Sequence, residues 1–290
     1  MSNVKLVGVA QVESAIGEVD LNIDHHLRWI EKARAQDVEV LVFPEVSLTG
    51  HHGGITLLSS AMRRDDARLQ RLADASGPMM TILGFIEEGP AAQFYNSCIA
   101  VRDGQIVHLH RKINIPNYGL LEEGKHYATG RFVETYQMDE DWRMGLLICA
   151  DLWNPALANL AFLHGSTLLI SPISSAREAV GAEFDNPTGW KIATQFYSMV
   201  YGAPTILANR CGVENDLTFW GGSRIVDPHG RELAVAGDGE ELITAQLDYD
   251  AVRHARTLLP TVRDSNFALV QRETNRLGGV LGIPEDFLRD

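Results

Sequence analysis

Short apolar runs rich in Val, Ile and Leu recur along the whole chain, and amphipathic helical patterns separate many of them. Such runs are typical of strands whose two faces are both buried. Strands in such number are best accommodated in a mixed sheet, or a pair of sheets, that helices cover. The clearest predicted strands are 4–12, 38–45, 79–88, RMGLLICA (143–150), STLLISPIS (166–174) and PTILANRCG (204–212).

Helices and hairpins connect these runs. Amphipathic or capped patterns predict helices at 21–36, 60–75 and 187–201, the last with Pro187 in its first turn after Asp185 or Asn186. Asp103-Gly104 divides the segment 96–112, and this dipeptide favours the type I′ turn of a β-hairpin. Pro228-His229-Gly230 marks a second hairpin. We predict one domain over 1–290 with a C-terminal tail from about 272, because no Gly/Ser linker or repeat divides the chain.

Charge and cysteine content narrow the classes of function. The net charge is −13, which disfavours binding to nucleic acid or to an anionic membrane surface. The N-terminus lacks a basic segment and a cleavage site, and no apolar run approaches the ~18 residues that span a membrane. Cys98, Cys149 and Cys211 match no zinc-binding spacing. We therefore expect a cytoplasmic protein with free thiols and no metal site.

Three predicted strands end on groups that can carry chemistry. Glu45 closes VLVFPE, Lys112 closes IVHLHRK, and Cys149 closes GLLIC. Each alone is most simply the first solvated residue after a strand, and a cysteine in such a run is often a packed hydrophobe. A base, a cation and a thiol at one edge of a sheet are together the set that hydrolyses an amide through a thioester.

The chemistry requires all three residue types. A free thiol with a pKa of about 8.5 is mostly protonated at neutral pH, so a carboxylate such as Glu45 is needed to accept its proton. Negative charge then develops on the carbonyl oxygen of the substrate. Lys112 and a backbone N–H just after Cys149 are suitable donors to that oxygen, and losing one such donor typically costs about 10²–10³ in rate.

Three motifs make the chain resemble the nitrilase, or carbon–nitrogen hydrolase, superfamily. They are VLVFPEVSLTG around Glu45, LHRKINIPNYGLLEEGKHYATG (109–130) and GLLICADLWNP (145–155), in the order of the family. The resemblance extends from residue 4 to about 270 and implies an α-β-β-α sandwich whose members associate through helices. We therefore expect a homodimer or a higher homo-oligomer.

The resemblance also assigns roles. It implies that Glu45 is the general base, Lys112 the oxyanion donor and Cys149 the nucleophile. The family has a second glutamate before an aromatic-x-x-Gly ending. Aligning that ending with 127–130 selects Glu123, and a slip of one residue would select Glu122.

The same motifs suggest residues that contact the substrate. His51 follows the first motif, where the family often has a bulky pocket residue, although a solvated loop is the alternative. Tyr118 and Ala150 lie within the second and third motifs. Trp153 is either a wall of the pocket or core filler. Cys98 and Cys211 are expected to be packed thiols.

The expected activity is hydrolysis of a C–N bond in a small amide or carbamoyl compound, without a cofactor. True nitrilases usually place Trp-Glu after the nucleophile, whereas this chain has Ala150-Asp151. The motifs are most similar to the glutaminase portion of glutamine-dependent NAD synthetases. A glutaminase-like, ammonia-supplying subunit of a complex and a nitrile-hydrolysing enzyme are the alternatives.

Overall fold

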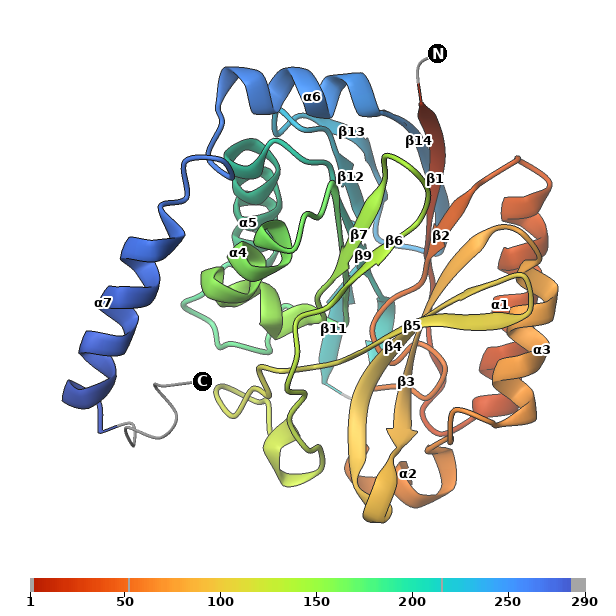
Figure 1. Ribbon diagram of the computed structural model, residues 1–290. Coiled ribbons are helices and arrows are strands. Elements are labelled where there is room, and N and C mark those ends of the chain that lie inside the picture. The colour runs from red at the N-terminus through yellow and green to blue at the C-terminus, as the bar shows by residue number, and fades with distance from the viewer. Residues whose placement is uncertain (1–2, 52, 215, 283–290) are drawn as a thin grey trace.

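Two six-stranded sheets stack face to face in the computed structural model, which describes residues 3–51, 53–214 and 216–282 (Figure 1). The first sheet has the order β14-β1-β2-β3-β4-β5, and the second has the order β13-β12-β9-β8-β7-β6. The strands of the first sheet are β1 (Val4–Gln11), β2 (Val40–Val42), β3 (Met80–Glu88), β4 (Phe94–Arg102), β5 (Gln105–Arg111) and β14 (Glu241–Asp248). Those of the second are β6 (Thr135–Gln137), β7 (Arg143–Leu146), β8 (Leu168–Ile173), β9 (Thr205–Asn209), β12 (Arg224–Val226) and β13 (Glu232–Val235). A separate antiparallel pair joins β10 (Cys211–Glu214) to β11 (Leu217–Trp220).

Helices cover the two outer faces of the stacked sheets. Helices α1 and α3 lie against the first sheet, and α4 and α5 lie against the second, as Figure 1 shows. The predicted α-β-β-α sandwich is therefore confirmed. The helices are α1 (Val19–Arg34), α2 (Gly53–Ser60), α3 (Ala67–Ser76), α4 (Pro155–Leu163), α5 (Asn186–Tyr201), α6 (Tyr249–Leu258) and α7 (Phe267–Val280), with short 3₁₀ turns η1 (Pro90–Ala92), η2 (Glu123–Lys125) and η3 (Cys149–Trp153).

The core occupies the space between the sheets. Fully buried Val42 and Ile82 of the first sheet belong to the same apolar cluster as Ile170 and Ile206 of the second. Alternate residues such as Leu41 point the other way, into the layer under α1 and α3. Because these strands bury both faces, their sequences read as continuous apolar runs rather than as alternating patterns.

Most predicted elements are present, with shorter bounds. Asp103 and Gly104 both have positive φ (51° and 71°), as a type I′ turn requires, and they join β4 to β5. Asp185 caps α5 by accepting a hydrogen bond from the N–H of Thr188. The helix predicted over 60–75 is only partly correct, because α2 ends at Ser60 and α3 begins at Ala67.

The apolar run that leads to Cys149 also differs from the prediction. Strand β7 ends at Leu146, and Cys149 starts the 3₁₀ turn η3 instead of ending a strand. The C-terminal region predicted as a tail from about residue 272 falls partly within helix α7, which lies beside α4 and α5 at the left of Figure 1. In the described part of the chain, no helix has the length and apolarity needed to cross a membrane.

Candidate active site

Four loops meet at one edge of the stacked sheets. Strands β2 and β3 of the first sheet run parallel, as do β7, β8 and β9 of the second, so their carboxyl ends gather together. Glu45 lies just after β2, Lys112 after β5, Cys149 after β7 and Ser174 after β8. This arrangement matches the general preference of α/β folds for sites outside the carboxyl ends of strands.

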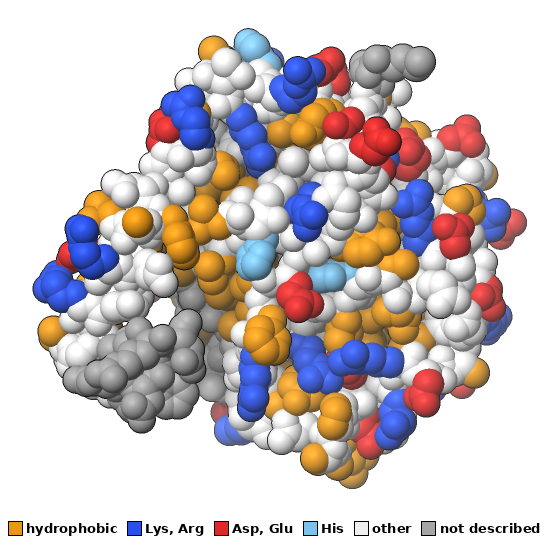
Figure 2. Space-filling view, in the orientation of Figure 1, with side chains coloured by type: hydrophobic (Ala, Val, Ile, Leu, Met, Phe, Trp, Pro, Cys, Tyr) orange, Lys and Arg blue, Asp and Glu red, His pale blue; other side chains and the backbone are white. Residues whose placement is uncertain are grey.

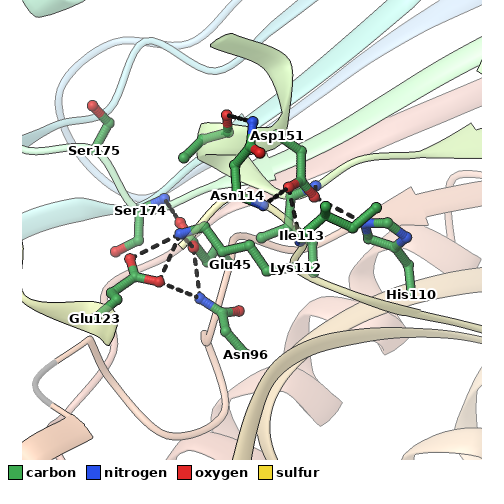
Figure 3. A network of polar contacts seen from close by, with 12 residues as sticks. Glu45, Asn96, His110, Lys112, Ile113, Asn114, Glu123, Asp151, Ser174 and Ser175 are labelled. Atoms are coloured by element: carbon green, nitrogen blue, oxygen red, sulfur yellow. Dashed lines mark hydrogen bonds and ion pairs between the residues drawn. The ribbon is translucent and has the colours of Figure 1, made fainter. Parts of the chain in front are cut away.

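Lys112 lies at the centre of a buried charged cluster. Its Nζ donates to Glu45 Oε1 at 2.7 Å and to the two carboxylate oxygens of Glu123 at 2.8 and 2.9 Å (Figure 3). The side chains of Lys112 and Glu45 are fully buried, and that of Glu123 is 7% exposed. Burial disfavours the ammonium, but Glu123 and Glu45 outweigh burial and raise the pKa of Lys112 well above its ordinary value. Lys112 is therefore a fixed cation.

Glu45 is held in its ionised form. Asn96 Nδ2 donates to Glu45 Oε1 at 2.8 Å, and the backbone N–H of Ser174 donates to Oε2 at 2.7 Å. Burial acts to raise the pKa of Glu45, but the positive charges of Lys112 and His51 outweigh it and leave that pKa below its ordinary value. A carboxylate that stays ionised in a dry site is a competent proton acceptor.

The Cys149 thiol is the proton donor that faces this carboxylate. It is half-buried, and the carboxylate of Glu45 lies close enough to act on its ionisation. Burial, and next the charge of Glu45, raise the pKa of Cys149 well above its ordinary value, so the resting group is a thiol. Cys149 also has a positive φ of 46°, an uncommon conformation for a side-chain-bearing residue. The backbone thus turns sharply at the thiol, a kind of strain that clusters at functional sites.

A buried aspartate ties the cysteine turn to the lysine loop. Asp151 accepts hydrogen bonds from the N–H groups of Ile148, Ile113 and Asn114 at 3.0, 2.9 and 2.7 Å. His110 Nε2 lies 2.8 Å from Asp151 Oδ2. Asp151 therefore fixes the segment after Lys112 relative to the segment around Cys149.

A glycine on β3 lets the Glu45 loop approach the sheet. A Cβ at Gly84 would lie 2.5 Å from the backbone nitrogen of Val46 and 2.6 Å from the carbonyl oxygen of Pro44. Those contacts are too short to exist, so only glycine allows Glu45 to sit over this strand.

Comparison with known proteins agrees with this geometry. The family model described as "Carbon-nitrogen hydrolase" matches residues 6–257. The chain belongs to the carbon-nitrogen hydrolase family. The predicted enzyme class, an amidase-like carbon-nitrogen hydrolase of the nitrilase superfamily, is thereby confirmed.

Two relatives and one solved structure illustrate the range of this family. A glutamine-dependent NAD(+) synthetase of Thermotoga maritima is 29% identical over 84% of this chain and 42% of its own length, so the chain spans less than half of that relative. An N-carbamoylputrescine amidase of Solanum lycopersicum is 29% identical over 65% of this chain and 66% of its own length. A carbon-nitrogen hydrolase from Helicobacter pylori G27 has the same fold, with a TM-score of 0.82 over 92% of this chain and 97% of that one at 24% identity.

The residues predicted to contact the substrate of this hydrolase fall into two groups. Tyr118, Ala150 and Trp153 line one pocket of about 600 Å³ beside the loop that carries Lys112. The ring of Trp153 also packs on Trp190 with centroids 4.4 Å apart, so it serves the core as well. His51 lies elsewhere, near Glu45.

His51 is half-buried and has an unusual environment. Its ring meets Phe219 edge-on at 6.0 Å, and its Nδ1 has no hydrogen-bond partner among the described residues. Its charge contributes to the low pKa of Glu45. His51 is thus placed near the reacting groups rather than in a solvated loop.

The geometry separates the two adjacent glutamates. Glu123 contacts Lys112, whereas Glu122 is on the surface and pairs with Lys125 at 2.7 Å. Cys98 and Cys211 are buried, and burial raises the pKa of both thiols, that of Cys211 to about 12. The thiols of Cys98 and Cys211 are therefore packed, as the sequence predicted.

Sequence reasoning missed the residues that hold Glu45 and Asp151 in place. Asn96 and the N–H of Ser174 donate to Glu45, and His110 contacts Asp151, which the sequence noted only for its place after Cys149. The sequence did contain a signal for two of these residues, because each is a polar residue within a predicted strand. Asn96 begins the segment NSCIAV of β4, and His110 lies near the end of β5.

Proposed function

We propose that this protein hydrolyses a C–N bond in a small amide or carbamoyl compound through a thioester on Cys149. The observation that carries the proposal is the contact between three groups of complementary chemistry. The Cys149 thiol is close enough to Glu45 for the two groups to affect each other's ionisation, and Lys112 Nζ lies 2.7 Å from the same carboxylate. A structural ion pair does not require a thiol as its third member.

The first half of the reaction begins with proton transfer. Because Cys149 rests as a thiol and Glu45 as a carboxylate, the proton moves from Sγ to Glu45 as Sγ attacks the carbonyl carbon. The carbonyl π electrons move to oxygen and form a tetrahedral oxyanion. When the C–N bond breaks, Glu45 returns the proton to the leaving nitrogen, which departs as ammonia or an amine.

Lys112 stabilises the oxyanion in this scheme. Its ammonium stays charged between two carboxylates, so it offers a preorganised positive charge where negative charge develops. Glu123 binds the same ammonium with both carboxylate oxygens and positions it. In the second half, water attacks the thioester carbon as Glu45 takes its proton. The C–S bond then breaks, the acyl group leaves as the acid, and Glu45 returns the proton to Sγ.

The relatives support two forms of substrate. The names of an N-carbamoylputrescine amidase and a glutamine-dependent synthetase specify a carbamoyl compound and glutamine. A glutaminase-like role in a larger assembly is therefore the second candidate, favoured by the match to the synthetase over 84% of this chain. We expect little action on nitriles, because attack on a nitrile forms no oxyanion for Lys112 to bind at first.

A substrate panel tests the proposal. The purified protein would be assayed for ammonia and amine release from simple amides, N-carbamoyl amines and glutamine, with Cys149→Ala as the control. A matched amide and nitrile with the same side chain are included. Release from at least one amide or carbamoyl compound, lost in Cys149→Ala, is expected. A higher kcat/KM for the nitrile, or equal release by the variant, contradicts the proposal.

We also propose that the chain forms a homodimer or a higher homo-oligomer. Ile192, Phe196 and Met199 of α5 are 61%, 49% and 52% exposed, and Val280 and Leu281 at the end of α7 are 76% and 74% exposed. In Figure 2, hydrophobic side chains line the strip between α7, at the left, and the rest of the molecule. Large apolar patches of this kind mark interaction surfaces.

The apolar residues Ile283 and Phe287, which the sequence also assigns to this region, lie outside the described residues. Light scattering at micromolar concentration should give a mass that is a multiple of 32.0 kDa. A mass of one chain would contradict the proposed oligomer.

A further inference from the structure

The proposed general base is held partly by the opposite sheet. Glu45 follows β2 of the first sheet, whereas the N–H that donates to its Oε2 at 2.7 Å belongs to Ser174, just after β8 of the second sheet (Figure 3). A backbone N–H lies in the plane of its peptide bond, so its direction is set by the backbone around it. The donor to Glu45 is therefore placed by whatever holds the segment that follows β8.

The two oxygens of Glu45 have different surroundings. Oε1 accepts from Lys112 Nζ at 2.7 Å and from Asn96 Nδ2 at 2.8 Å, which fills its two acceptor positions. Among the described residues, Oε2 accepts from the Ser174 N–H alone, so one of its acceptor positions stays available. Oε2 is thus the oxygen that can take the proton of Cys149, and the Ser174 N–H fixes where that oxygen lies.

Asn209 holds the backbone that follows Ser174. Strands β8 and β9 pair side by side up to Ile173 and Asn209, the last residue of each strand. Beyond that point the Asn209 side chain continues the pairing. Its Oδ1 accepts from the N–H of Ser175 at 2.9 Å, and its Nδ2 donates to the carbonyl oxygens of Gly221 at 2.9 Å and of Ser175 at 3.4 Å. Because Asn209 is fully buried, water does not compete for these contacts.

The side chain of Ser175 is anchored as well. Its Oγ accepts from Asn186 Nδ2 at 2.8 Å and from Trp190 Nε1 at 3.0 Å, and both donors belong to helix α5. All three residues are buried. Two different elements, β9 and α5, therefore hold the turn that carries the Ser174 N–H.

We propose that Asn209 is a positioning residue for the general base. By holding the backbone of Ser175, it keeps the Ser174 N–H on Oε2 of Glu45 and leaves the other acceptor position of that oxygen for the thiol proton. This inference rests on the proposed function, because it takes Glu45 as the acceptor of the Cys149 proton. The alternative is that Asn209 only stabilises the end of β9, and the two roles differ in what they do to the reactivity of the thiol.

Labelling of Cys149 by methyl methanethiosulfonate measures the proton transfer without any substrate. Sγ forms a disulfide with the methylthio sulfur, methanesulfinate leaves with the electron pair of the broken S–S bond, and Glu45 takes the thiol proton. The rate constant of labelling, followed by mass spectrometry of the full chain, reports this step, while the amplitude reports the folded fraction. In Asn209→Ala the rate constant at pH 7 should fall about tenfold, because the base is no longer held in place.

The pH profile of the same rate constant separates positioning from stability. An N–H that donates to a carboxylate favours the ionised form, so a displaced donor raises the pKa of Glu45. The acid limb in Asn209→Ala should therefore move to higher pH by about 0.5–1 unit. The charged or titratable side chains that interact electrostatically with Glu45 are those of His51, Cys98, Lys112, Tyr118, Tyr127 and Cys149. Glu123 shares the ammonium of Lys112 with it, and the substitution changes none of these groups.

Two further variants complete the comparison. Ser175→Ala removes the anchor to α5 but keeps the backbone contacts with Asn209, so the rate constant should fall only about threefold. Ser198→Ala is the matched control, because it breaks a buried hydrogen bond of 2.8 Å to Thr205 at the opposite end of β9. It should lower the melting temperature while leaving the rate constant and the acid limb as in the parent.

The outcomes separate this inference from the proposed function. Slower labelling and a raised acid limb in Asn209→Ala, with both unchanged in Ser198→Ala, support the positioning role. An unchanged rate constant and acid limb in folded Asn209→Ala, or an equal loss in Ser198→Ala, overturn it. If Asn209→Ala does not fold, slower labelling in Ser175→Ala supports the role and an unchanged rate constant overturns it. Labelling of Cys98 or Cys211 in preference to Cys149 would instead contradict the proposed function itself.

Discussion

Arg111 and Lys112 are adjacent in the sequence, yet each binds a different buried glutamate on opposite sides of the first sheet. Arg111 donates from Nε and Nη2 to the two carboxylate oxygens of Glu87, at 2.7 and 2.8 Å. Arg64 and Ser97 also donate to Glu87. Lys112 instead binds Glu45.

The two glutamates differ in the neighbours that surround their carboxylates. Among the described residues, the hydrogen-bond partners of Glu87 are two arginines and a serine hydroxyl, none of which releases a proton readily. The carboxylate of Glu87 therefore serves the fold. Glu45 has a thiol as one partner, and that thiol can release its proton. A buried carboxylate beside a cation is thus structural or catalytic according to its remaining neighbour.

The largest contrast should come from neutralising each glutamate without changing its size. Glu45→Gln cannot accept the thiol proton, so kcat/KM of the folded fraction should fall by about 10²–10⁴. Glu87→Gln leaves two arginines without their charge partner. It should lose about 3–5 kcal/mol of stability, as broken buried pairs do, while turnover of the folded fraction stays near the parent value.

Steady-state kinetics and thermal melts of both variants decide this comparison. Similar losses of turnover in Glu45→Gln and Glu87→Gln would remove the distinction between the two clusters.

The two cations provide the next contrast. Lys112→Ala removes the oxyanion donor that we propose, so it should lower turnover by at least about 10². Arg111→Ala should lower the melting temperature but change turnover of the folded enzyme less than about threefold. A tenfold loss of rate would require the loss of about 1.4 kcal/mol of transition-state stabilisation, and Arg111 does not contact the proposed reacting groups. Rates measured well below both melting temperatures check this. A normal rate in Lys112→Ala would exclude it from the mechanism.

The adjacent glutamates give a smaller effect. Glu123→Gln weakens the charge-assisted hydrogen bonds that position Lys112, each of about 1.5–3 kcal/mol, so turnover should fall about 10- to 100-fold. Glu122→Gln alters only a surface pair and should leave turnover unchanged. Side-by-side kinetics of the two variants would show whether the role belongs to position 122 instead.

The smallest effect concerns pH. Lys112 and His51 outweigh burial and lower the pKa of Glu45, so its carboxylate remains the proton acceptor until pH falls through that low value. With a neutral amide substrate, kcat/KM should fall only below about pH 4.3, the ordinary pKa of glutamate. No rise should appear near pH 8.5, because the pKa of Cys149 is raised.

The fold must be followed in the same experiment. Glu45 and Glu87 both have lowered pKa values, so each contributes stability above its unfolded pKa and loses it as pH falls through its folded pKa. Circular dichroism at each pH separates unfolding from loss of catalysis. A rise in kcat/KM that follows a single ionisation near pH 8.5 would contradict a protonated resting thiol.

The sequence predicted those parts of the molecule that depend on local pattern. Continuous apolar runs identified the buried strands, and Asp103-Gly104 identified the hairpin between β4 and β5. The three strand-end motifs located Glu45, Lys112 and Cys149 before any contact between them was known.

What the sequence could not predict depends on contacts across the chain. Asn96 reaches Glu45 from 51 positions away, and the N–H of Ser174 reaches it from 129 positions away. The positive φ of Cys149 is equally hidden, because an apolar run gives no sign of where its strand gives way to a 3₁₀ turn. The contact between Ser174 and Glu45 forms only when the two sheets stack, because β8 and β2 belong to different sheets.

The central claim is that Cys149 forms a covalent acyl intermediate. The most direct test is to measure the mass of the acylated peptide. The protein would be mixed with a slowly hydrolysed amide or carbamoyl substrate, quenched in acid, digested and analysed by mass spectrometry. We predict that the peptide containing Cys149 gains the mass of the acyl group, while ammonia or amine appears in equal amount. Cys149→Ala should show no such adduct. Turnover without any adduct on Cys149, or an adduct formed equally on Cys98 or Cys211, would contradict the account.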